Sequence, residues 1–145
     1  MKTAIVYYSR HHENTKKVLD AIAANHEVTL IDVLKTKDVD LSEYDRIGFA
    51  SGIYFSKFAA EVLAYATNVL PAGKDVFYIA TCGSMRKNYF DAISKIAADK
   101  GCKELGRYIC KGFDTYGPFK LVGGIAKGHP DESEIADAVK FYEGL

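Results

Sequence analysis

Short polar side chains follow an apolar run near the N-terminus, in an arrangement suited to binding an anion. The apolar run covers residues 4–8, and Ser9, Asn14 and Thr15 offer hydroxyl and amide groups in the segment after it. These side chains can reach a phosphate without placing a bulky group between it and the backbone. The sequence therefore predicts a phosphate-binding loop, whose residues are Ser9, Arg10, His11, His12, Glu13, Asn14 and Thr15.

The flanking residues predict the elements that position this loop. A short continuous apolar run is typical of a buried parallel strand, and Val18, Leu19 and Ile22 mark one face of a helix. A strand that turns sharply into a helix directs free backbone N–H groups and the positive end of the helix dipole at one point. That point is where we expect the anion.

The whole chain limits the class of protein. Its 145 residues are enough for one domain, and 19 basic against 19 acidic residues leave no bias toward nucleic acid. No apolar segment approaches the length of a membrane span. Three cysteines form neither a CxxC pair nor an even disulfide framework, and four scattered histidines predict no metal site. We expect a protein of the reducing cytoplasm.

Strands and helices alternate along the rest of the chain. After the first strand, further strands are predicted over residues 27–32, 46–51, 75–81 and 103–110, with a direct passage between the second and third. Helical faces are marked by Phe58, Val62, Tyr65 and Val69, by Tyr89, Ile93 and Ile96, and by Ile135, Ala138, Val139 and Tyr142. Right-handed crossovers then build a five-stranded parallel sheet of order 2-1-3-4-5 between two helical layers, an α/β sandwich over residues 1–145.

In such a sheet, ligands bind beyond the carboxyl ends of the strands, between strands one and three. The loop after the third strand, with Ser51, Gly52, Ile53, Tyr54, Phe55 and Ser56, carries large apolar side chains where a loop is ordinarily polar. Tyr54 and Phe55 either cover one face of a flat aromatic ligand or pack as a cap on the next helix.

The loop after the fourth strand completes the predicted site. Thr81, Cys82 and Gly83 are small, and Tyr89 is the nearest aromatic side chain, which either covers the ligand or packs on the core. The long glycine-rich segment 111–128 is interpreted as a cover over the sheet edge, with partner contact as the alternative. His129, before Pro130, is interpreted as a neighbour of a helix cap rather than a ligand.

Two other phosphate chemistries fail on spacing and residue type. A phosphatase loop needs an Arg six positions after its Cys, and Arg86 follows Cys82 by four. A response-regulator receiver has the same sheet order, and Lys111 matches its lysine. It needs acidic residues after the first and third strands, however, where this chain has Ser9 and Ser51.

The loop over residues 9–15 resembles the phosphate loop of flavodoxins, usually written T-x-T-G-N-T. Ser9, Asn14 and Thr15 match its outer positions, and Glu13 stands where the family usually has Gly. A Glu there either adopts a left-handed conformation or changes the turn. The resemblance extends over the full length, at the size of a short-chain flavodoxin.

This resemblance implies non-covalent FMN, which the absence of G-x-G-x-x-G after the first strand also favours over FAD or NAD. It implies an electron carrier whose partner is a redox protein or a small-molecule acceptor. Flavodoxins are usually acidic, so this neutral chain departs from their usual docking mode. Two alternatives stay open: an FMN-dependent quinone or NAD(P)H oxidoreductase, and a flavin-free scaffold. The first rests on residues 53–58, which resemble a loop of quinone-linked protoporphyrinogen dehydrogenases.

Overall fold

The computed structural model describes residues 1–10, 13–37, 39–86, 88–113 and 126–145. Within these, parallel strands lie in the order β2-β1-β3-β5-β6, with β4 pairing only with β3. The strands are β1 (Thr3–Tyr8), β2 (Thr29–Asp32), β3 (Arg46–Tyr54), β4 (Lys57–Phe58), β5 (Asp75–Cys82) and β6 (Lys103–Lys111). Leaving out β4, this is the predicted order 2-1-3-4-5.

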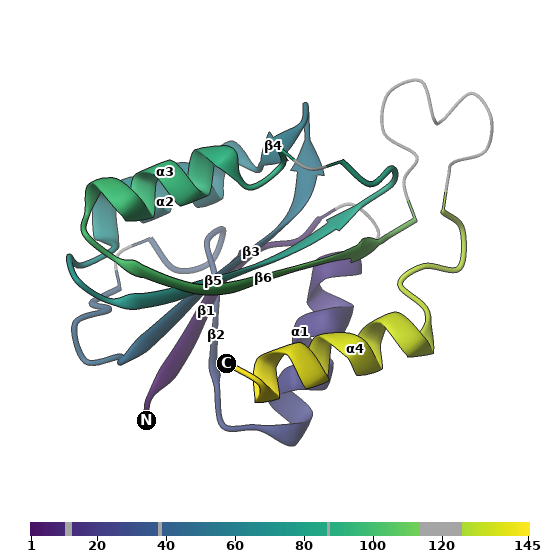
Figure 1. The fold of residues 1–145 in the computed structure, drawn as a ribbon, viewed down its shortest axis with the longest axis horizontal. Helices are drawn as coiled ribbons and strands as arrows, with labels where there is room; N and C mark the ends of the chain where they lie inside the picture. Colours follow the sequence, from purple (N-terminus) through teal and green to yellow (C-terminus); the bar gives the residue numbers. More distant parts are fainter. Residues whose placement is uncertain (11–12, 38, 87, 114–125) are drawn as a thin grey trace.

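Helices cover both faces of the sheet, as Figure 1 shows. α1 (Asn14–Asn25) and α4 (Glu132–Glu143) lie on one face, and α2 (Ala60–Val69) and α3 (Asp91–Asp99) on the other. Each face has its own apolar cluster because alternate strand residues point to opposite sides. Phe77 and Ile79 join the cluster under α1 and α4, whereas Val76 and Tyr78 join the one under α2 and α3. The predicted three-layer sandwich is confirmed.

Helix ends follow the local sequence. α4 begins with a capping box in which Asp131 accepts the N–H of Glu134 and Glu134 accepts the N–H of Asp131. α3 is followed by Gly101 in the left-handed conformation, with φ of 70°. The Lys100 ammonium donates to three carbonyl oxygens at the end of α2, those of Ala66, Thr67 and Leu70.

The segment after the predicted third strand differs from the expectation. β3 continues three residues beyond Ser51, and Tyr54 pairs with Lys57 in an antiparallel hairpin. Phe58 therefore lies in β4 and not on a helical face; its ring is buried against Phe90, with centroids 5.6 Å apart. The spacing from Phe58 to Val62 matched a helical period by coincidence, because α2 begins at Ala60.

Two smaller boundaries also shift. β2 begins at Thr29 rather than at Glu27. Tyr89 lies in a turn before α3, which begins at Asp91. No helix in the described residues is long and apolar enough to cross a membrane.

Candidate functional site

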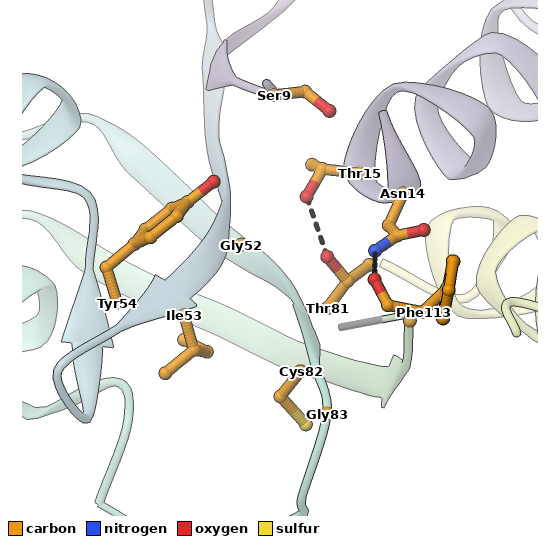
Figure 2. Close-up of a pocket in the computed structure, with 11 residues that line it drawn as sticks. Ser9, Asn14, Thr15, Gly52, Ile53, Tyr54, Thr81, Cys82, Gly83 and Phe113 are labelled. Atoms are coloured by element: carbon orange, nitrogen blue, oxygen red, sulfur yellow. Dashed lines mark hydrogen bonds between the residues drawn. The ribbon is translucent and has the colours of Figure 1, made fainter. Parts of the chain in front are cut away.

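A pocket lies at the carboxyl ends of β1, β3 and β5, where the sheet order predicted the ligand (Figure 2). Its empty volume is ≈ 350 Å³, counted with the open space at its mouth. The walls come from the loop before α1, the β3 end, the β5 end and the segment after β6. The lining residues are Ser9, Asn14, Thr15, Gly52, Ile53, Tyr54, Thr81, Cys82, Gly83, Gly112 and Phe113.

The N-terminus of α1 forms one wall of the pocket. Glu13 precedes the helix in the left-handed conformation, with φ of 54° and ψ of 32°, and its side chain makes no capping hydrogen bond. Ser9 Oγ accepts the N–H of Lys16 at 3.1 Å. The N–H groups of Asn14 and Thr15 have no acceptor within the helix itself. The first of the two conformations expected for Glu13 is therefore the one adopted, and this residue keeps the backbone conformation that a Gly would favour.

Two threonine hydroxyls join α1 to β5 at the back of the pocket. Thr15 Oγ1 and Thr81 Oγ1 lie 2.9 Å apart, and the two residues are only 1% and 3% exposed. In this pair one hydroxyl donates to the other, which leaves a single O–H free to donate onward. The Ser9 hydroxyl also has an O–H that remains available to donate, because its oxygen accepts the backbone N–H of Lys16.

Asn14 closes the side of the pocket nearest β6. Its Nδ2 donates to the carbonyl oxygen of Phe113 at 2.8 Å (Figure 2), and its Oδ1 is buried with no hydrogen-bond partner. A Cβ at Gly112 would lie 2.7 Å from Asn14 Nδ2, so only glycine allows this approach. An unpaired buried acceptor costs about 1–3 kcal/mol, which a hydroxyl or protonated phosphate oxygen of a ligand would recover.

The β3–β4 hairpin supplies the aromatic wall. The Tyr54 ring stands edge-on to Tyr8, with centroids 5.7 Å apart and an interplanar angle of 86°. A Cβ at Gly52 would lie 3.2 Å from the Tyr54 hydroxyl oxygen, so this ring lies close over the Gly52 backbone. Ser51 instead stabilises the fold: its buried hydroxyl accepts the N–H of Ala59 and connects β3 to the start of α2.

The cysteines show no sign of nucleophilic chemistry. Cys82 is buried at the end of β5, with its thiol 3.4 Å from Met85 Sδ and 3.7 Å from the carbonyl oxygen of Cys110. Burial raises the pKa of the Cys110 thiol to about 12, so that thiol stays protonated at neutral pH. No disulfide joins any of the three cysteines, all of which lie in the described residues.

The pocket brings together nine of the residues expected from the sequence. Of the others, Arg10, Glu13, Phe55 and Ser56 lie in the same loops but do not line it, and Ser51 lies beneath it. Tyr89 is buried, with its hydroxyl donating to the Ser84 carbonyl at 2.6 Å, which matches its core-packing alternative. His11 and His12 lie outside the described residues. Sequence reasoning missed Gly112 and Phe113 as lining residues.

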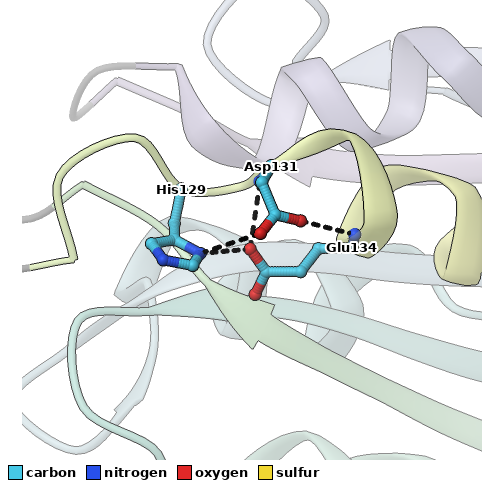
Figure 3. A group of neighbouring side chains, drawn as sticks. All are labelled: His129, Asp131 and Glu134. Atoms are coloured by element: carbon cyan, nitrogen blue, oxygen red, sulfur yellow. Dashed lines mark hydrogen bonds and ion pairs between the residues drawn. The ribbon is translucent and has the colours of Figure 1, made fainter.

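A second polar cluster lies at the start of α4 (Figure 3). His129 Nδ1 contacts Glu134 Oε1 and lies 3.8 Å from Asp131 Oδ2, and these side chains have the right atoms for a metal. Glu134 also accepts the N–H groups of Asp131 and Lys111, both at 3.0 Å. Burial alone would raise the pKa of Glu134, but these bonds and the His129 ring outweigh it and lower that pKa. The cluster is a helix cap, as expected for His129.

Comparison with known proteins agrees with the geometry. The flavodoxin domain family matches residues 4–104. An uncharacterized protein of Methanocaldococcus jannaschii is 34% identical over 147 residues, covering 100% of this chain and 98% of that protein.

Two solved structures have the same fold. A short-chain flavodoxin associated with a bacterial microcompartment superposes with a TM-score of 0.69 at 19% identity, over 100% of this chain and 97% of that one. A flavoprotein from Lactobacillus acidophilus, solved in complex with FMN, superposes with a TM-score of 0.59 at 20% identity, over 74% and 92% of the two chains.

The fold and the position of the pocket thus define a flavodoxin-like α/β protein. The family match covers more than half of the chain, and the chain belongs to the flavodoxin family.

Proposed function

We propose that this protein binds FMN non-covalently in the pocket at the carboxyl edge of the sheet and carries electrons between partners in the cytoplasm. The observation that carries the proposal is the N-terminus of α1. There the first-turn N–H groups, the Ser9 hydroxyl and the Thr15–Thr81 hydroxyl pair lie at one wall of the pocket. A helix N-terminus with added hydroxyl donors suits a terminal phosphate.

Each remaining wall suits a different part of FMN. The buried Asn14 Oδ1 needs a donor, and the hydroxyl groups of a ribityl chain are donors. Gly52, Ile53 and Tyr54 on β3, and Cys82 and Gly83 at the end of β5, line the pocket with small or apolar groups, which suits a flat ring. The FMN complex of the Lactobacillus acidophilus flavoprotein supports this assignment.

The isoalloxazine ring of bound FMN would supply the redox chemistry, and the protein would hold it and tune it. Neutral amide and hydroxyl donors would hold the phosphate, and the apolar hairpin residues would exclude water from one ring face. In an apolar slot, added negative charge on a ligand is disfavoured, so Ile53 and Tyr54 would lower its reduction potential. No side chain needs to act as an acid or a base.

The test is reconstitution of purified protein with excess FMN, followed by absorbance at the flavin bands and mass analysis of the released cofactor. We expect one FMN per chain. Release of FAD, or no flavin bound, would reject the proposal. Rapid turnover of a quinone with NADH or NADPH would instead identify an oxidoreductase.

A further inference from the structure

Two large apolar side chains are exposed beside the mouth of the pocket. Phe55 is 79% exposed at the tip of the β3–β4 hairpin, and Met85 is 48% exposed in the loop after β5. β3 and β5 are neighbours in the sheet; Tyr54, just before Phe55, and Gly83, two residues before Met85, both line the pocket. Figure 1 shows the hairpin rising from the sheet beside α2 and α3.

The backbone at Phe55 is strained, and because the side chain is exposed, packing in the core does not explain why a Phe is there. Phe55 and Ser56 have φ angles of 52° and 64°, and they form the two-residue loop between the paired residues Tyr54 and Lys57. A hairpin loop with two left-handed residues is ordinarily Asn-Gly. A bulky side chain in this conformation costs about 1–2 kcal/mol. Backbone strain of this kind, at a residue whose side chain is exposed to solvent, indicates a functional constraint.

Three exposed cations stand on the same loops. Arg10 follows Ser9, Lys57 follows the hairpin tip, and Arg86 follows Met85. None of these three is within ion-pair distance of a described carboxylate. Glu13 is the exposed acid on the loop before α1. Met85 lines a surface depression together with Asp131, Glu134 and Asp137 at the start of α4, where Asp131 and Glu134 form the helix cap and Glu134 also accepts the N–H of Lys111. We call Arg10, Phe55, Lys57, Met85 and Arg86 the mouth rim.

We propose that the mouth rim is the docking surface for an acidic redox protein, an inference that rests on the carrier function proposed above. Phe, Met and Arg are the residue types enriched at protein interfaces, and exposed apolar anchors at the centre of such surfaces carry most of the binding energy. The three cations would steer a partner of opposite charge toward the pocket. An anionic bilayer is a weaker match, since each cation contributes only about 1 kcal/mol at its surface.

The first experiment measures binding by calorimetry to two probes of opposite charge, an acidic iron–sulfur ferredoxin and a basic cytochrome c, with and without FMN. We expect binding of the ferredoxin with an affinity that falls about tenfold or more between low and high ionic strength, because salt screens exposed charges. Equal or tighter binding of cytochrome c, or no salt dependence, would overturn the proposal. Equally salt-dependent capture by phosphatidylglycerol vesicles without ferredoxin binding would assign the surface to a membrane.

Variants then separate the rim from the overall charge. The double variant Lys57→Glu and Arg86→Glu should weaken ferredoxin binding about tenfold or more, whereas Lys103→Glu, an exposed cation at the opposite end of β6, should leave it unchanged. Phe55→Asn should weaken binding while raising the melting temperature, because Asn tolerates the left-handed conformation. A Phe55→Asn variant that melts lower and binds normally would show that Phe55 is a structural cap.

These measurements distinguish the surface from the carrier function. Flavin-free protein that binds ferredoxin but never accepts FMN would reject the carrier and keep the surface. Protein that binds FMN but shows no charge-dependent docking would reject the surface and keep the carrier.

Discussion

Replacing Glu13 by Gly separates the two effects that a glutamate can have in a phosphate loop. In the structure Glu13 already has the left-handed conformation, with φ of 54°. Its strain is therefore present without ligand, and relieving it should change the stability of the protein rather than its affinity for FMN. The carboxylate, in contrast, acts on the bound phosphate. The two contributions can be measured independently with two variants.

Glu13→Gln keeps the backbone strain and removes the charge, whereas Glu13→Gly removes both. A left-handed non-glycine residue costs about 1–2 kcal/mol of stability. Replacing it by Gly removes this cost but adds a smaller one of about 0.5–1 kcal/mol, because Gly loses more chain entropy on folding. Any loss of a favourable charge at the α1 N-terminus is common to both variants. The free energy of unfolding of Glu13→Gly should therefore exceed that of Glu13→Gln by about 0.5–1 kcal/mol.

FMN affinity should follow the charge alone. We expect both variants to bind FMN more tightly than the wild type by a similar factor, and the gain to shrink as salt screens the carboxylate. Urea unfolding gives the stabilities, and fluorescence titration at two ionic strengths gives the dissociation constants. Unchanged affinity in both variants would mean that the phosphate is not held beside Glu13. Tighter binding in Glu13→Gly alone would mean that the loop relaxes when it is empty.

Three further predictions concern the pocket and the cap of α4. Thr15→Val removes one partner of the buried hydroxyl pair with Thr81. It should weaken FMN binding about tenfold or more in a titration, since hydrogen bonds to a charged group contribute about 1.5–3 kcal/mol. Thr67→Val, which removes an exposed hydroxyl of α2, is the control. Tyr54→Ala should admit water to the ring face, loosen FMN and raise the potential of its second one-electron reduction in a potentiometric titration, and an unchanged potential would assign the ring to hairpin packing. The pKa of Glu134 is lowered in the fold, so the stabilisation from this carboxylate is fully present above its ordinary pKa of 4.5 and is lost as the pH falls through the folded pKa. Glu134→Gln should flatten that part of the acid unfolding curve.

The sequence was sufficient for the sheet because its strands are strongly patterned. β1, β3 and β5 each contain a continuous run of four or more apolar residues, and with alternating helices these strands allow few arrangements. The position of the pocket, at the carboxyl ends of the strands, followed from the strand order alone. Nine of its lining residues follow in turn, because they lie at strand ends whose position is fixed by that order.

The missed features depend on contacts between distant segments or on unusual turns. The approach of Gly112 to Asn14 joins residues far apart in the chain, and no local pattern signals it. The hairpin was missed because Phe55 and Ser56 lack the Asn-Gly signature of a two-residue turn. The cap that Lys100 places on α2 likewise follows from the fold and not from helix periodicity.

Backbone strain distinguishes the two edges of the sheet. At the amino edge, the left-handed residues between helices and strands are glycines, Gly73 and Gly101. At the carboxyl edge, one described left-handed residue is a glycine, Gly128, but four are not: Glu13, Phe55, Ser56 and Ala126. Because each costs about 1–2 kcal/mol that glycine would avoid, the edge that carries the pocket retains side chains at the expense of stability. Substitutions that relieve this strain should therefore stabilise the fold, and those that also weaken binding identify the side chains that function requires.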